Sequence, residues 1–219
     1  MSARPGNGIG MTSERTRLRM IETLRREGVT DQRVLNAMAE IPRHLFVDEG
    51  IASRAYEDVA LPIGHGQTIS SPTIVGLMTQ LLLEKQPMNK VLEVGTGCGY
   101  QTAVLGKLVR EVYTLERIAE LMDKARRHLR DLRFYNIRYK HADGNAGYSE
   151  GAPYDGILMA ASAAKVPDAL KQQLAVGGRM VLPVGTEDQW LYVVDRTEQG
   201  FVETKREAVR FVPLLPGLA

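Results

Sequence analysis

The sequence is poor in cysteine, in aromatic residues and in net charge. Cys98 is the only cysteine among 219 residues, so no disulfide can form within the chain. This fits a reducing compartment such as the cytoplasm. The formal net charge is only +2, and the basic residues are interleaved with acidic ones, which is typical of solvated helix faces rather than of a nucleic-acid surface. We therefore expect a cytoplasmic protein that binds no nucleic acid.

Long uninterrupted hydrophobic runs are also missing. Residues 59–83 contain no Asp, Glu, Lys or Arg, but prolines, glycines and polar residues interrupt them, so they cannot span a membrane. We interpret their first half as a buried or ligand-lining loop. Residues 1–11 lack the apolar centre of a secretory signal and are predicted to be a disordered leader. No cluster of metal-ligating residues stands out, and we expect a monomer without membrane attachment.

Helical signals dominate the first third of the chain. The hydroxyls of Thr12–Ser13 predict a helix over about 14–27, which Gly28 ends. Thr30 is predicted to cap a second amphipathic helix, which ends before Pro42. A third helix is expected to open at Ser71–Pro72, with proline at its first position.

From residue 90 onward, strand patterns alternate with helix patterns. Strands are expected at 91–94, 112–115, 137–140, 156–159, 179–183 and 190–195, with one or two antiparallel strands within 201–215. Helices are expected at 100–109, at about 118–129 and near 167–174. This alternation predicts an α/β fold whose mostly parallel, Rossmann-like sheet carries helices on both faces and an antiparallel C-terminal strand. Residues 72–219 would form this core, and residues 12–71 a small helical cap with a substrate loop.

The strongest chemical signal is the turn Glu93–Gly99, which lies between a strand and a helix. Its three glycines have the spacing G-x-G-x-G, whereas a dinucleotide fingerprint would require its third glycine at position 100, where the chain has tyrosine. Glu93 would repel a phosphate near the helix N-terminus. A carboxylate there suits a ligand with an ammonium group, such as the methionine end of S-adenosylmethionine. The turn therefore predicts a methyltransferase.

Acidic residues also follow the next two strands. Glu116 ends the second strand, where an acid can accept hydrogen bonds from both ribose hydroxyls of an adenosine. The alternative for Glu116 is an exposed ion pair with Arg117. Asp143–Gly144 follows the third strand, where an acid can meet the adenine amino group, although such a pair on its own is also an ordinary turn.

Several segments together resemble bacterial members of the protein-L-isoaspartate (D-aspartate) O-methyltransferase family. Besides the glycine turn they are Pro42–Val47, Tyr56–Asp58, Ile63–Ser70, Ala152–Asp155, Gly177–Gly185 and Phe211–Leu214. The similarity runs from about Met11 to the C-terminus and includes Gln67–Pro72, a segment specific to this family. It implies a class I methyltransferase fold. It also implies methyl transfer from S-adenosylmethionine to the free carboxylate of L-isoaspartyl and D-aspartyl residues in damaged proteins, which leaves S-adenosylhomocysteine and an ester that converts through succinimide.

The resemblance also implies roles for individual residues. Ser70 corresponds to the active-site serine, and residues 68–71 also border the cofactor. We expect substrate contacts from Thr68 and Ile69, and from His65 because it lies between Gly64 and Gly66. The implied cofactor contacts are Thr68, Ser70, Ser71, Glu93, Gly95, Thr96, Gly97, Cys98, Gly99, Glu116, Arg117, Asp143 and Gly144. Judged from the residues alone, Ser70 is equally well explained as the N-cap of the helix that opens at Pro72. Ser71 could take that capping role instead. His65 is as readily a structural loop residue.

The implied reaction agrees with the residues available. A carboxylate of ordinary pKa, ~4, is ionised at neutral pH and attacks a sulfonium methyl without a general base. The protein then mainly aligns the reactants and excludes water, and Ser70 would position the carboxylate rather than attack. A nucleic-acid methyltransferase is disfavoured, because Cys98 belongs to the turn and the Asn/Asp-Pro-Pro-aromatic motif is absent. A cofactor-binding module without catalysis is the remaining alternative, and Thr68 and Ser70 argue against it.

Overall fold

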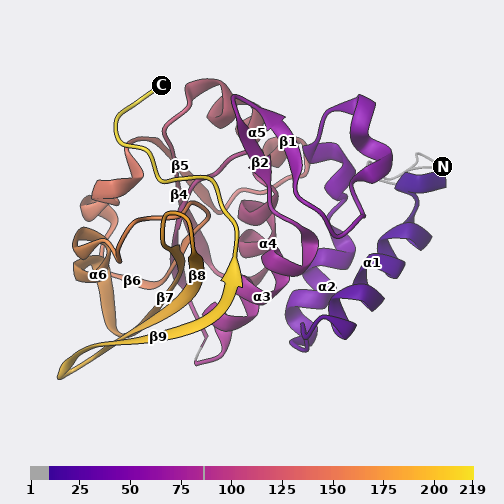
Figure 1. The fold of residues 1–219 in the computed structure, drawn as a ribbon. Helices are drawn as coiled ribbons and strands as arrows, with labels where there is room; N and C mark the ends of the chain where they lie inside the picture. The colour runs from indigo at the N-terminus through magenta and orange to yellow at the C-terminus, as the bar shows by residue number, and fades with distance from the viewer. Residues whose placement is uncertain (1–9, 86) are drawn as a thin grey trace.

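The computed structural model describes residues 10–85 and 87–219. The predicted leader, residues 1–11, therefore lies mostly outside the described residues. Its last two residues begin a short 3₁₀ helix, η1 (Gly10–Thr12). The described chain folds around one large sheet with a two-stranded hairpin beside it (Figure 1).

The large sheet has seven strands in the order β5-β4-β3-β6-β7-β8-β9. Strands β3 to β7 pair in parallel, whereas β8 is antiparallel to both of its neighbours. The predicted α/β class, with its antiparallel C-terminal part, is confirmed. The strands are β3 (Lys90–Val94), β4 (Glu111–Glu116), β5 (Ile137–His141), β6 (Tyr154–Met159), β7 (Leu174–Val184), β8 (Gln189–Thr197) and β9 (Gly200–Val209).

Six α-helices and five 3₁₀ helices surround the strands in the described part of the chain. They are α1 (Glu14–Arg26), α2 (Gln32–Glu40), α3 (Pro72–Leu83), α4 (Tyr100–Leu108), α5 (Ala119–Asp131), α6 (Asp168–Gln173), η1, η2 (Arg43–Phe46), η3 (Glu49–Arg54), η4 (Gly144–Ala146) and η5 (Ser149–Gly151). No helix within these described residues is long and apolar enough to cross a membrane.

The N-terminal caps follow side-chain chemistry, with one departure from expectation. Ser13 caps α1 by accepting a hydrogen bond from the Thr16 amide, as predicted. The prediction that Thr30 caps α2 is wrong, because the Asp31 carboxylate accepts the Arg33 amide at 2.8 Å. The Thr30 amide instead donates to Gln80 of α3 at 2.6 Å, so Thr30 joins α2 to α3 rather than capping it.

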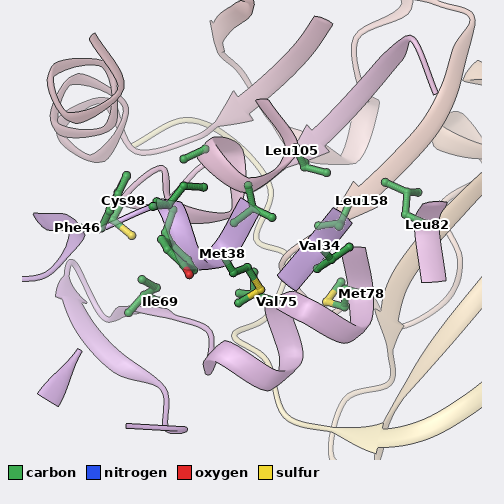
Figure 2. Packing of buried hydrophobic residues seen from close by; sticks show 14 of the residues in the cluster. Val34, Met38, Phe46, Ile69, Val75, Met78, Leu82, Cys98, Leu105 and Leu158 are labelled. Atoms are coloured by element: carbon green, nitrogen blue, oxygen red, sulfur yellow. The ribbon is translucent and has the colours of Figure 1, made fainter. Parts of the chain in front are cut away.

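Two apolar clusters cover the two faces of the sheet. Successive side chains of β3 point to opposite faces of the sheet. Val91 therefore packs in a cluster with residues of α1 to α5, and Leu92 packs in a second cluster with residues of α6. In the first cluster Val34 and Met38 of α2 lie beside Val75 and Met78 of α3 (Figure 2). The N-terminal helices therefore share a single core with the sheet, and the segment between them and α3 contributes Leu61, Ile63 and Ile69 to it.

That segment is a hairpin, where the sequence predicted only a loop. Strands β1 (Leu61–Gly64) and β2 (Gln67–Ile69) pair antiparallel. Their turn is left-handed, with φ of +92° at Gly64, +53° at His65 and +68° at Gly66. The buried residues at 61, 63 and 69 give too short an alternation to be distinguished from a loop.

The segment predicted as one or two strands over 201–215 is a single strand followed by a tail. After β9 ends at Val209, the chain runs back across the carboxyl ends of the parallel strands (Figure 1). Ser162 exchanges backbone hydrogen bonds with Val212 and Leu214. The backbone of Ala219 bonds to Arg117 and Ala119. Pro213 has no amide hydrogen, which limits any continuation of the ladder.

A buried ion pair between β7 and β8, in the antiparallel part of the sheet, also bonds to the end of α3. The Arg179 guanidinium of β7 donates to both Asp195 oxygens of β8, at 2.8 and 3.1 Å. It also donates to the Leu81 carbonyl at 2.8 Å and to Glu84 at 2.9 Å. The two paired side chains are only 7% and 13% exposed. Arg179 therefore joins the C-terminal end of α3 to β7 and β8.

We predict that Asp195→Ala lowers the free energy of unfolding by about 2–3 kcal/mol, because Arg179 would stay buried with its best partner removed. Thermal or urea unfolding measures the loss. The exposed pair of Arg54 and Glu57, 3.0 Å apart, provides the control, and Arg54→Ala should leave the unfolding midpoint unchanged within error. Equal losses in the two variants would contradict this assignment.

Candidate active site

A pocket of about 930 Å³, its open mouth included, lies at the carboxyl ends of the parallel strands. It sits where β4 and β6 flank β3, the switch point at which open α/β sheets bind ligands. Four segments supply most of its lining: the hairpin and its exit (63, 67–70), the glycine turn with the start of α4 (95–98, 100, 101), the end of β4 (115–118) and the C-terminal tail (212–215).

Most residues predicted for the site come together in this pocket, and a few do not. Those that line it are Thr68, Ile69, Ser70, Gly95, Thr96, Gly97, Cys98, Glu116, Arg117 and Gly144. His65, Ser71, Glu93, Gly99 and Asp143 lie outside its lining. The second group stands next to the first in sequence, so the structure separates residues that face the pocket from residues that support them.

The glycine turn uses its amide groups internally. The amides of Gly95 and Thr96 donate to the Leu115 carbonyl, at 2.9 and 3.1 Å, and the Gly97 amide donates to Glu116 at 2.9 Å. Gly97 has a φ of +54°, and a Cβ there would lie 3.3 Å from Ile63. Because three amides of the turn are already bonded, it does not offer the cluster of free donors that cradles a phosphate.

Glu116 presents a fixed carboxylate to the pocket. Its side chain is almost fully buried, with Oε2 accepting from Gly97 and Oε1 from the Ile118 amide at 3.0 Å. A carboxylate has about four acceptor positions, so it retains capacity for hydroxyl groups of a ligand. The alternative ion pair with Arg117 is not formed, because the Arg117 Nε donates to the Gly217 carbonyl at 3.1 Å.

Glu93 lies beneath the turn rather than in the pocket. It is 0% exposed, and its Oε2 accepts from the hydroxyls of Thr102 and Thr114 at 2.5 and 2.6 Å. Burial raises its pKa to about 8, although these hydrogen bonds act in the opposite direction. The protonated, uncharged form therefore predominates at neutral pH. Such a group ties β3 to α4 and β4, instead of offering a charge to a ligand's ammonium group as the sequence suggested.

Ser70 and Ser71 divide the two roles that the sequence left open. The Ser71 hydroxyl accepts from the Ile74 amide at 3.4 Å and caps α3. Ser70 lines the pocket, and its carbonyl accepts from the Arg43 guanidinium at 2.7 Å. The capping function thus belongs to Ser71, which leaves the Ser70 hydroxyl available to a ligand.

His65 and Asp143 occupy turns at the edge of the site. His65 is exposed at the tip of the hairpin. Asp143 accepts from the Gly217 amide at 2.7 Å and from the Asn145 amide at 2.8 Å. Burial acts to raise the pKa of Asp143, but these hydrogen bonds outweigh it and the pKa is lowered. Asp143 therefore anchors the tail that borders the pocket.

Cys98 has no reactive thiol despite its place in the lining. Its side chain is buried, and burial raises its pKa to about 11. Among the described residues, no group of three or more His, Cys, Asp and Glu is placed to hold a metal ion. The polar groups in the lining include the hydroxyls of Thr68 and Ser70 and the carboxylate of Glu116.

Sequence reasoning missed several parts of the lining. Tyr100 and Gln101 open α4 and face the pocket, as do residues 212–215 of the tail. Residues 212–214 belong to the quoted motif Phe211–Leu214, but no spacing rule connected the tail to the glycine turn. Only the tertiary fold brings these segments together.

The family model of protein-L-isoaspartate(D-aspartate) O-methyltransferase matches residues 15–218. The chain belongs to this family. It is 59% identical over 213 residues to the protein-L-isoaspartate O-methyltransferase of Nitrosomonas eutropha, covering 96% of each chain. It is 58% identical over 221 residues to that of Methylobacillus flagellatus, covering 99% of each.

Solved structures of the family agree with the fold. One protein-L-isoaspartate O-methyltransferase superposes with a TM-score of 0.83 at 27% identity, covering 92% of this chain and 67% of that one. A family structure from Plasmodium falciparum, in complex with S-adenosyl-L-homocysteine, gives a TM-score of 0.79 at 26% identity. It covers 91% of this chain and 98% of that one. The Rossmann-like methyltransferase fold is therefore confirmed.

We predict that Glu93→Gln removes a pH dependence from the stability of the protein. With a folded-state pKa of about 8 against an unfolded value of 4.5, the carboxyl group binds its proton more tightly when folded. Its contribution is complete below the unfolded pKa and is lost as the pH rises through the folded pKa, at up to about 1.4 kcal/mol per pH unit.

Glutamine keeps the shape and the acceptor oxygen but cannot ionise, so its variant should lose less stability between pH 5 and about 8.5. Urea unfolding of both proteins at several pH values measures the difference. Parallel stability curves for the two proteins over this range would show that Glu93 does not carry the proton assigned to it.

Proposed function

We propose that this family member transfers a methyl group from S-adenosylmethionine to the free carboxylate of L-isoaspartyl and D-aspartyl residues in damaged proteins. The products are S-adenosylhomocysteine and a methyl ester, which converts through succinimide. The observation that carries the proposal is that Ser70 of the hairpin exit and Glu116 of the sheet line one pocket, around a glycine turn whose amides are already bonded. Family membership and the bound product in the Plasmodium falciparum structure support the cofactor.

The residues present suit an adenosine better than a phosphate. Glu116 has acceptor capacity for ribose hydroxyls, and Gly95 and Gly97 keep the turn free of side chains. A Cβ at Gly144 would lie 2.4 Å from Val94, so only glycine fits at that edge. When bound, the cofactor supplies an electrophilic methyl group on its sulfonium.

We assign the remaining predicted cofactor contacts by their position. Those in the lining would touch the cofactor: Thr68, Ser70, Gly95, Thr96, Gly97, Cys98, Glu116, Arg117 and Gly144. The predicted contacts outside the lining would act indirectly, because they hold the cap of α3, the glycine turn and the C-terminal tail in place. They are Ser71, Glu93, Gly99 and Asp143.

On the substrate side, the hairpin exit positions the nucleophile. An isoaspartyl carboxylate is already ionised at neutral pH, so Ser70 need only donate a hydrogen bond and fix the direction of attack. Ile69 is buried and holds the strand, while Thr68 borders the pocket and His65 at the hairpin tip would meet the flanking peptide. Apolar side chains in the lining, such as Ile63 and Leu214, limit access of water to the reacting groups.

The same proposal covers the cellular setting. A single buried cysteine fits a reducing compartment, and we place the enzyme in the cytoplasm, acting as a monomer on isoaspartyl proteins and peptides and not on nucleic acid.

We expect the protein, incubated with methyl-labelled S-adenosylmethionine, to form a base-labile methyl ester on an isoaspartyl peptide and none on the matched aspartyl peptide. Both peptides carry the same charge and composition, so only the carboxylate position differs. Transfer of label to RNA or DNA, equal labelling of the two peptides, or no label in any acceptor would refute the proposed function.

We further predict that Ser70→Ala lowers kcat about 10²-fold while the Kd of S-adenosylhomocysteine changes less than about threefold, because the hydroxyl chiefly aligns the carboxylate and is one of many contacts to the cofactor. Steady-state kinetics and calorimetry measure the two effects. Ser71→Ala is the matched control, which should cost about 1 kcal/mol of stability through the lost cap and leave kcat near its parent value. A kcat loss shared equally by both variants would assign Ser70 a structural role.

A further inference from the structure

Arg43 is a completely buried cation directly behind Ser70. It begins η2 and is 0% exposed. Its Nε donates to the Ala55 carbonyl at 2.8 Å, and its Nη2 donates to the Ser70 carbonyl at 2.7 Å. Its Nη1 has no hydrogen-bond partner among the described residues. Arg43 lies outside the pocket lining, so it reaches the site only through the residues that it holds.

The other side of the guanidinium faces the cofactor turn. Its Cζ lies 4.7 Å from the centroid of the Tyr100 ring. Tyr100 is the first residue of α4, directly after Gly99, and it lines the pocket. Phe46 packs edge-on against the same ring, with 5.5 Å between centroids. One guanidinium therefore connects the backbone of the substrate segment with the start of the cofactor helix.

Arg43 forms no direct ion pair with an acid among the described residues. Its two hydrogen bonds go to carbonyl oxygens, and its third neighbour is an aromatic ring. The titratable groups whose charges act on it are Asp58, Tyr56, Cys98 and Tyr100. Burial lowers the pKa of Arg43, but an arginine side chain stays protonated in proteins. A buried cation without a directly paired carboxylate is costly, and an apolar side chain of similar size would often be more stable. Stability alone therefore gives no reason for an arginine at this position.

We propose that Arg43 is a positioning residue for methyl transfer, which locks the Ser70 backbone against Tyr100 and places a buried positive charge behind the substrate carboxylate. This inference rests on the proposed function. The contacts of Arg43 with Ser70 and Tyr100 fix the direction of the Ser70 hydroxyl relative to the glycine turn. They thereby fix the angle at which the substrate carboxylate approaches the methyl group. A misplacement of about 1 Å can lower a rate about 10²-fold. The charge favours the ionised, nucleophilic form of the bound carboxyl group.

The test compares Arg43→Lys and Arg43→Met with a matched control. Arg17 of α1 is also a buried arginine of the N-terminal region, 6% exposed, with Nη1 donating to the Glu40 carbonyl at 3.3 Å and Nε without a partner among the described residues. It is not in the pocket lining, so Arg17→Met removes a similar buried group from outside the site. The measurements are kcat and KM for an isoaspartyl peptide, the Kd of S-adenosylhomocysteine and the unfolding midpoint.

Arg43→Lys should lower kcat about 10- to 100-fold with the Kd of S-adenosylhomocysteine within about threefold, because a lysine keeps the charge but not the paired hydrogen bonds. Arg43→Met should lower kcat as far, and should also move the acidic limb of the kcat profile to higher pH, since kcat reports groups in the bound complex. Arg17→Met should leave kcat within about twofold of the parent.

A kcat of Arg43→Lys within about twofold of the parent would overturn the inference. So would an equal kcat loss in Arg17→Met, or an acidic limb that Arg43→Met leaves in place. If neither Arg43 variant folds, Tyr100→Leu removes the ring beneath the guanidinium, and an unchanged kcat there would overturn the inference as well. The proposed function fails separately, because it requires the parent enzyme to methylate the isoaspartyl peptide.

Discussion

A chain of hydrogen bonds beneath the pocket holds the parts of the site in place. The Thr96 and Thr114 hydroxyls lie 2.6 Å apart, and Thr114 and Thr102 both donate to the buried carboxyl group of Glu93. This chain joins the glycine turn to β3, β4 and α4 at the point where a ligand must be supported. Because the carboxyl group is uncharged when protonated, it can sit in the core at a modest electrostatic cost. The turn above it can then keep its left-handed glycines and remain open.

The site is thus built between two buried ionisable groups of opposite character. Glu93 gives up its charge in the core and acts as a neutral connector under the cofactor turn. Arg43 keeps its charge and lies on the substrate side, between Ser70 and Tyr100. Glu116, nearer the pocket, stays fixed by two backbone amides. These differences follow from the partners available to each group: hydroxyls for Glu93, carbonyls and a ring for Arg43, and amides for Glu116.

The sequence predicted the sheet, its helices and the cofactor turn, because these depend on local periodicity and on glycine spacing. It predicted the family through motifs spread over the whole chain. It could not tell which carboxylates face a ligand, since Glu93 and Glu116 both stand at strand ends and differ only in what packs around them. It also missed the hairpin at 61–69 and the returning tail, whose pairing is set by distant partners. For Ser70 and Ser71, both equally suited to capping, only the position of Ile74 decided between them.

The C-terminal tail makes the pocket a product of the whole chain. Gly217 bonds to Asp143 and Arg117, which lie 74 and 100 positions earlier in the sequence. Contacts of such long range close large loops of chain, so they must offset the entropy lost on closing those loops. A chain whose tail is not docked would keep the glycine turn and the substrate hairpin but not a closed pocket. A ligand that binds only the closed pocket adds its binding free energy to the completed fold alone.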